Sequence, residues 1–231
     1  HTSDPRSGEI IESDINWYHN VMKLLRNWLF VQTAAVNPDA RKTEFKNEVM
    51  GELIRFVSSH EVGHTLGLPH NFGSSSAYPV DSLRSATFTK KYGTAPSIMD
   101  YARFNYVAQP GDKGVALIPS EWETPNVGVY DIYSIMWGYK PILDTDAFGE
   151  KKVLNQWITE KADDLMFRFG SSSIDPSSQT EDLGNDAIKA SNYGIANLKR
   201  IVPNLIEWTT EDGENYEELQ YLYGQVLSQF R

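Results

Sequence analysis

Residues 60–70 read H-E-V-G-H-T-L-G-L-P-H, a short stretch rich in side chains that bind metals. His60 and His64 are four residues apart, so on a helix their imidazoles project from one face, one turn apart, and can bind the same ion. Glu61 follows on the same helix, where its carboxylate can reach a water at the metal without binding the metal itself. This spacing predicts two metal ligands and a general base on one helix.

His70 is the expected third ligand, because a tetrahedral catalytic zinc takes three protein ligands and keeps one position open for water. Gly67 can adopt a positive φ, which would end the helix and turn the chain so that His70 reaches the ion, and Pro69 prevents further helix. Taken singly, each histidine would be an ordinary helix residue and Gly67 an ordinary helix cap. However, three of the five histidines in the chain fall here at ligand spacing, which makes a chance arrangement a poor explanation.

Zinc is the metal that this set of ligands favours. Three neutral nitrogens and a water suit its tetrahedral coordination, although copper, cobalt or nickel could occupy the same ligands. Zn²⁺ is therefore the expected cofactor, bound by His60, His64 and His70.

The composition of the 231 residues excludes several other classes of protein. The formal net charge is -10, which offers no basic field to a nucleic acid backbone. No apolar run approaches the roughly 20 residues that span a bilayer, so we expect no membrane span. The chain contains no cysteine, which excludes disulfides, thiolate catalysis and cysteine-based zinc sites.

Hydrophobic periodicity predicts an α+β chain that is mostly helical. Alternation of apolar and polar residues over 11–17 indicates a strand. Thr43 is the expected N-cap of the helix that carries the metal ligands. We expect a catalytic core over residues 1–140 and a mainly helical C-terminal subdomain over 141–231. Helical spacing indicates helices over about 20–36, 43–67, 82–91, 130–137, 150–161, 187–200 and 214–229.

A second segment, S-I-M-D-Y over residues 97–101, helps to interpret the histidine motif of residues 60–70. The pattern H-E-x-x-H-x-x-G-x-x-H resembles the zinc signature of the metzincin clan of metalloproteases. In that clan a tight turn with a methionine lies beneath the zinc, and Met99 matches that methionine. Astacin-like and serralysin-like members also have a tyrosine in the pattern S-x-M-x-Y, which Tyr101 matches. The resemblance implies that Met99 supports the site, and that Tyr101 is a weak fifth ligand or a hydrogen-bond donor to the oxyanion of the reaction.

Asn71 narrows the resemblance, because it differs from the Asp, Glu, Ser or Pro that follows the third histidine in the best-known metzincin families. The longer text H-E-V-G-H-T-L-G-L-P-H-N-F with S-I-M-D-Y-A-R-F-N-Y is similar instead to a group of large bacterial metzincin-like proteases. That likeness implies a zincin-like catalytic domain with a partial N-terminal mixed sheet, within a longer chain that is secreted, periplasmic or at the cell surface. It also implies that further strands of the sheet precede Asp4.

Together these features predict a zinc-dependent endopeptidase that hydrolyses a protein or peptide substrate. Two alternatives stay open, namely a zinc-binding interaction module without catalysis and a zinc hydrolase of a non-protein amide. Glu61 argues against the interaction module, because such a protein has no chemical need for a carboxylate beside the open zinc position. Only a substrate pocket would separate the two hydrolases, and we expect residues 71–96 to form its wall.

Overall fold

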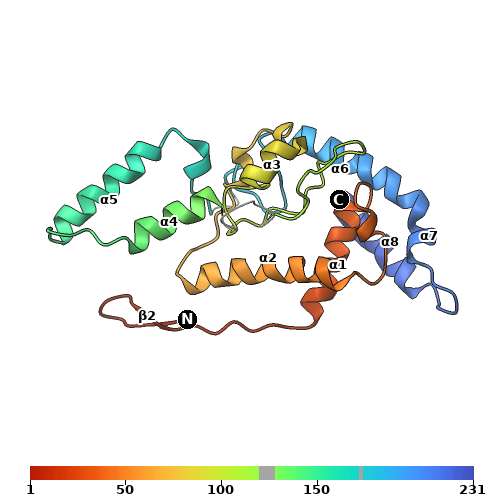
Figure 1. The fold of residues 1–231 in the computed structure, drawn as a ribbon, viewed down its shortest axis with the longest axis horizontal. Helices are drawn as coiled ribbons and strands as arrows, with labels where there is room; N and C mark the ends of the chain where they lie inside the picture. Colours follow the sequence, from red (N-terminus) through yellow and green to blue (C-terminus); the bar gives the residue numbers. More distant parts are fainter. Residues whose placement is uncertain (120–127, 172–173) are drawn as a thin grey trace.

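The computed structural model describes residues 1–119, 128–171 and 174–231, and most of its regular structure is helical (Figure 1). Each helix that the periodicity predicts is present. The helices are α1 (Asn20–Thr33), α2 (Asn47–Thr65), α3 (Ala86–Tyr92), α4 (Val129–Tyr139), α5 (Ala147–Lys161), α6 (Ala187–Ile201), α7 (Leu205–Thr209) and α8 (Glu217–Phe230). Short 3-10 helices lie at Pro38–Ala40, Ser75–Ala77, Ser82–Arg84, Leu165–Phe167 and Val202–Asn204.

The strands that the structure describes form one small antiparallel hairpin, β1 (Thr2–Ser3) and β2 (Ile10–Glu12). The strand predicted over 11–17 is wrong beyond Glu12, where residues 13–18 have no regular structure. Alternating side chains make a strand only where a neighbour supplies hydrogen bonds, and β2 pairs only with the two residues of β1. In the described chain, this antiparallel pair therefore stands in place of the predicted mixed sheet.

The long helix α2 ends as its sequence predicts but begins later. The predicted cap at Thr43 is wrong, because the helix begins at Asn47 and the Thr43 carbonyl accepts a hydrogen bond from the Arg26 guanidinium at 2.8 Å. At the other end Gly67 has a φ of 85°. The backbone N–H groups of residues 67 and 68 donate to the carbonyls of residues 64 and 63 at 3.0 and 3.1 Å. These two bonds form the Schellman arrangement that closes a helix and turns the chain back.

Helix α1 lies at the centre of the main hydrophobic core. It contacts α2, α6 and α8, and its residues Leu25, Leu29 and Phe30 are each no more than 1% exposed. Burial of side chains of this kind stabilises a fold by about 1.5–3 kcal/mol each. The hydrophobic core therefore joins helices from both sides of residue 140. The division of the chain at that residue into a catalytic core and a C-terminal subdomain stays a prediction. Its members from the other helices include Leu53, Leu198, Ile201, Leu205, Leu222 and Val226.

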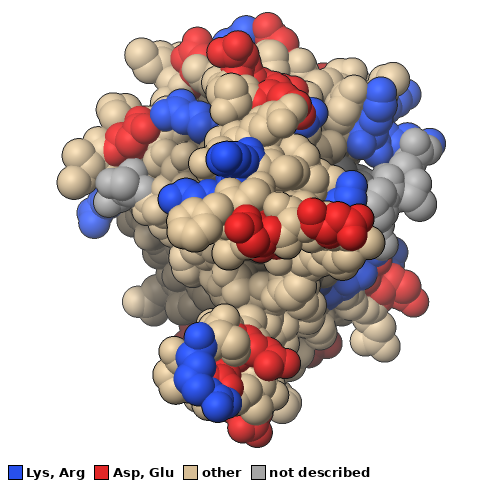
Figure 2. Space-filling view, turned by 90° about the vertical axis from the view of Figure 1, so that its left-hand side faces the viewer, with Lys and Arg blue, Asp and Glu red and all other residues tan. Residues whose placement is uncertain are grey.

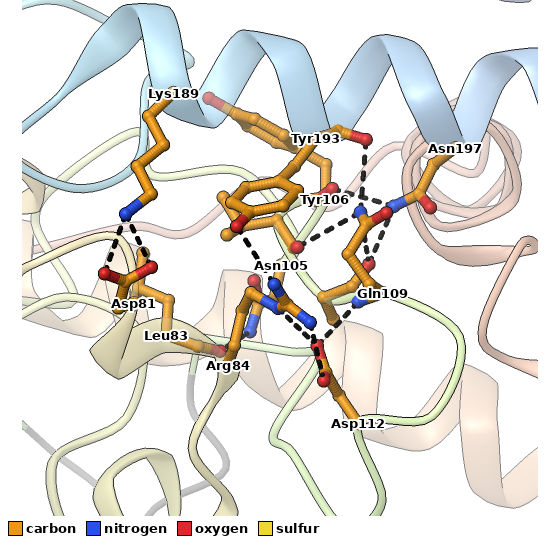
Figure 3. Close-up of polar contacts among 12 residues, drawn as sticks. Asp81, Leu83, Arg84, Asn105, Tyr106, Gln109, Asp112, Lys189, Tyr193 and Asn197 are labelled. Carbon is orange, nitrogen blue, oxygen red and sulfur yellow. Dashed lines mark hydrogen bonds and ion pairs between the residues drawn. The ribbon is translucent and has the colours of Figure 1, made fainter.

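Polar contacts fix residues 81–112, which include α3, against α6 (Figure 3). Arg84 forms a bidentate ion pair with Asp112, with N–O distances of 2.7 and 3.0 Å. Arg84 also donates to the Tyr193 hydroxyl of α6 at 3.0 Å. Farther along α6, the Asn197 side-chain amide donates to two backbone carbonyl oxygens at 2.8 and 2.9 Å. Residues 81–112, which follow the histidine motif in the sequence, are thus held by α6.

Within the described residues, none of the helices combines the length and the apolar character that crossing a bilayer requires. The face drawn in Figure 2 carries acidic and basic side chains interspersed with one another.

Candidate metal centre

Three histidine side chains converge at the end of α2. The Nδ1 atom of His60 lies 2.7 Å from the carbonyl oxygen of Ile98, and Nδ1 of His64 lies 2.8 Å from that of Leu68. A carbonyl oxygen only accepts hydrogen bonds, so both Nδ1 atoms carry the proton and both Nε2 atoms keep a free lone pair. Nε2 of His64 lies 3.1 Å from Nε2 of His70. One nitrogen from each histidine can be chosen so that all three lie within 4.8 Å of one another.

This set of donors fits a metal ion. Zinc–nitrogen bonds of about 2.0–2.1 Å at tetrahedral angles place ligand nitrogens about 3.3 Å apart, which is close to the observed separation between His64 and His70. Backbone carbonyls already fix the orientation of the His60 and His64 rings and leave Nε2 as the nitrogen of each that can bind a metal. The group predicted from the sequence, His60, His64 and His70, is therefore brought together as a possible metal site.

The surroundings of His60 and His70 favour neutral imidazoles. Burial lowers the pKa of His60, and the neighbouring His64 and His70 lower it further. Burial also lowers the pKa of His70, with a contribution from His64 in the same direction. The negative charge of Glu61 opposes both pKa shifts. Because metals bind the neutral form of histidine, the site is prepared for a metal at neutral pH.

Met99, the methionine that the resemblance singles out, packs against α2. It is 1% exposed and packs with Ile98, Phe56 and Leu68. A Cβ atom added to Gly63 would lie 2.2 Å from the Met99 sulfur, so the helix and the turn meet at a glycine between His60 and His64. The predictions from the sequence do not include Gly63, although a glycine inside a helix costs about 1 kcal/mol and so signals a special packing role.

Asn71, which follows the third ligand, ties three segments together. Its backbone N–H donates to the Met99 carbonyl at 3.0 Å. Its side-chain amide donates to the Arg168 carbonyl at 3.0 Å and its side-chain oxygen accepts from the Gly170 N–H at 2.9 Å. The Asn71 side chain is fully buried, so these bonds replace the water that it loses. An amide suits this position because it must both donate and accept.

Tyr101 lies against the ligand rings. Its ring centroid is 5.4 Å from that of His60 and 4.6 Å from that of His70, and the residue is 41% exposed. Phe72 stacks on the His70 ring at a centroid distance of 5.0 Å, and its ring centroid lies 5.3 Å from that of Tyr101. The tyrosine predicted to approach the metal thus lies beside two of the three histidines, and Phe72 is an aromatic neighbour that the motif alone does not indicate.

Asp131 is a second residue that the sequence patterns do not indicate. It belongs to the first turn of α4 and is 1% exposed. Its carboxylate accepts hydrogen bonds from the Ser97 hydroxyl at 2.6 Å, the Ile98 N–H at 2.8 Å and the Gly128 N–H at 2.9 Å. These donors lie 34, 33 and 3 residues away in the sequence, so only the last could have been anticipated from local helix signals.

A cavity of about 1120 Å³ borders the loop between His64 and His70. The hydroxyl of Tyr139, at the end of α4, donates to the Leu66 carbonyl at 2.7 Å and so links this loop to α4. None of the lining residues falls within 71–96, the segment expected to form a pocket wall. The apolar part of the lining includes Leu66, Leu68, Tyr133, Trp137, Ile158 and Phe169.

Comparison with known proteins gives one clear relationship. Neither the curated proteins nor the solved structures include a significant match to this chain. A family model described as Met-zincin, by contrast, matches residues 42–231, which include all three histidines, Met99 and Tyr101. The predicted resemblance is therefore confirmed, and the chain belongs to the Met-zincin family.

Proposed function

We propose that this protein is a zinc-dependent endopeptidase whose zinc is held by His60, His64 and His70. The observation that carries the proposal is the convergence of the three imidazoles, with lone pairs left free by the Ile98 and Leu68 carbonyls. Membership of the Met-zincin family, which suggests a metallopeptidase, supports the same function.

Each step of the proposed reaction uses a side chain at this site. Bound zinc would supply the Lewis acid that activates water and polarises the scissile carbonyl. Glu61 takes a proton from the attacking water and gives it to the nitrogen of the leaving amine as the carbon–nitrogen bond breaks. Tyr101 donates a hydrogen bond to the oxyanion that forms on the substrate carbonyl. The position of its ring beside His60 and His70 supports that role.

A protein or peptide is the substrate that we propose. The cavity beside the 66–69 loop has a mainly apolar and aromatic lining, which would suit an apolar side chain of an extended peptide. We assign it the pocket role that the sequence had suggested for residues 71–96. A location outside the cytoplasm, inferred from the resemblance to large bacterial proteases, stays a proposal.

The test compares Glu61→Gln with His64→Ala in a digest of a fluorescent peptide library, with metal content measured on the same samples. Glu61→Gln should keep its zinc and lose turnover, because the glutamate is a base and not a ligand. His64→Ala should lose both zinc and turnover, and a chelator should inhibit the wild-type protein.

Hydrolysis by Glu61→Gln at the wild-type rate would contradict the mechanism. A wild-type protein that binds zinc and cleaves none of the peptides would favour an interaction module. Cleavage of small amides without cleavage of peptides would favour a hydrolase of a non-protein amide.

A further inference from the structure

A buried hydrogen-bonded connection links α4 to the first metal ligand. His60 Nδ1–H donates to the Ile98 carbonyl at 2.7 Å, and the N–H of the same residue, Ile98, donates to Asp131 Oδ2 at 2.8 Å. The orientation of the His60 ring therefore depends on where the backbone at Ile98 lies. That backbone is held in turn by one carboxylate.

The other bonds of Asp131 fix the rest of the turn that contains Met99. Its Oδ1 atom accepts from the Ser97 hydroxyl at 2.6 Å, and the same hydroxyl oxygen accepts from the Met99 N–H at 3.0 Å. Its Oδ2 atom also accepts from the N–H of Gly128, the N-cap residue of α4, at 2.9 Å. Asp131 thus holds residues 97, 98 and 99 either directly or through one hydroxyl group.

The approach of α4 to this turn is close. A Cβ atom added to Gly128 would lie 1.8 Å from the Pro96 carbonyl oxygen, so only glycine fits at that point. The Tyr130 N–H donates to the same Pro96 oxygen at 3.0 Å. These contacts explain how α4 is brought to the turn, but neither of them acts on Ile98.

A carboxylate is the group that this position requires. Asp131 is 1% exposed, and its partners are two backbone N–H groups and one hydroxyl, none of which carries a charge. Burying a carboxylate among neutral groups is costly unless hydrogen bonds satisfy it, and here three donors converge on its two oxygens. An amide has only one acceptor oxygen, so asparagine would turn its NH₂ group toward at least one of the donors.

We propose that Asp131 is a positioning residue for the metal centre, which orients the ligand His60 through the backbone of Ile98. The inference rests on the proposed zinc site, although it does not depend on peptide hydrolysis. Groups that orient a metal ligand from outside its coordination shell commonly change metal affinity by about 10–100-fold when they are replaced. His64 offers an internal comparison, because its Nδ1 bonds to the Leu68 carbonyl, whereas the described partners of Asp131 are Ser97, Ile98 and Gly128.

The test measures zinc affinity by chelator competition for the wild-type chain, Asp131→Asn and a matched control, Asp112→Asn. Asp112 is also a carboxylate with several hydrogen bonds, but it accepts them from Arg84 and from the Gln109 N–H (Figure 3). We expect Asp131→Asn to weaken zinc binding by about 10–100-fold, and Asp112→Asn to leave it within about twofold of wild type. In ring-nitrogen NMR spectra of the zinc-loaded protein, the His60 Nδ1 signal should shift and the His64 signal should stay in place.

Wild-type zinc affinity in folded Asp131→Asn would overturn the proposal, as would an equal loss of affinity in Asp112→Asn. If Asp131→Asn does not fold, Asp131→Glu replaces it, since that change keeps a carboxylate but moves it by one methylene away from its place at the Ile98 N–H. Asp131→Glu should weaken zinc binding several-fold, and unchanged affinity would again overturn the proposal. A wild-type chain that binds zinc but cleaves no peptide would refute the proposed function alone, because zinc affinity would still report on Asp131.

Discussion

The helical core around α1 and the metal centre under α2 are held together by different kinds of interaction. The core depends on apolar side chains such as Leu29 and Phe30, which are fully buried and which many neighbours contact. The metal centre depends on single directed hydrogen bonds, several of which Asn71 donates or Asp131 accepts, both of them buried. The core should therefore set the stability of the fold, whereas the metal centre should respond to changes that barely affect that stability.

The largest effect that separates the two regions is expected from Phe30→Ala. The side chain is fully buried and packs edge-on against Trp208 at a centroid distance of 6.3 Å. Its loss should lower the free energy of unfolding by about 3–5 kcal/mol. In conditions where the variant stays folded, its zinc affinity should match that of wild type. Denaturant unfolding and chelator competition measure the two quantities, and a fall in zinc affinity of the folded variant would break the distinction.

Asp100 gives the next largest effect, through pH. Burial raises the pKa of Asp100 to about 7, although hydrogen bonds from Ser74 and Ser75 oppose the shift. Because the folded protein holds this proton more tightly than the unfolded chain, stability from this group is complete below about pH 4 and is lost as the pH rises through about 7. The loss is on the order of 2–4 kcal/mol. Asn at this position cannot ionise, so the difference in unfolding free energy between Asp100→Asn and wild type should change between about pH 4 and pH 7. A difference that stays constant over this range would refute the raised pKa of Asp100.

Tyr101→Phe separates the chemistry of the site from its assembly. The ring would still lie against His60 and His70, but the proposed donor to the oxyanion would be missing. Turnover should fall by about 100-fold, while zinc affinity and thermal stability stay close to wild type. Equal turnover in the two proteins would return Tyr101 to a packing role.

The smallest effect comes from Gly63→Ala, for which Gly51→Ala is the matched control in the same helix. A methyl group on Gly63 would collide with the Met99 sulfur, whereas a methyl group on Gly51 meets nothing within 4 Å. Both changes favour the helix intrinsically by up to about 1 kcal/mol. We expect Gly51→Ala to raise the unfolding free energy with no change in zinc binding, and Gly63→Ala to weaken zinc binding by about tenfold. Identical zinc affinities would show that Met99 moves aside freely.

What the sequence predicts is local, and what it misses depends on contacts distant in the chain. The ligands His60 and His64 follow from the helical repeat, and Gly67 follows from the way helices end. Asp131 could not be predicted in the same way, because its key partner Ile98 lies 33 residues away.

The same reasoning explains the errors in secondary structure. The strand predicted through residue 17 lacks a partner beyond Glu12 in the described chain, and alternation alone cannot supply one. Helix α7, Leu205–Thr209, is too short to show a clear period in the sequence.

The central claim is that His60, His64 and His70 hold one zinc ion, and direct titration of the metal-free protein with zinc tests it. Wild type should bind a single ion per chain, since the three histidines form one group. His70→Ala should bind it far more weakly, while its circular dichroism spectrum stays that of a folded protein. No saturable binding by wild type, or equal binding by His70→Ala, would contradict the account.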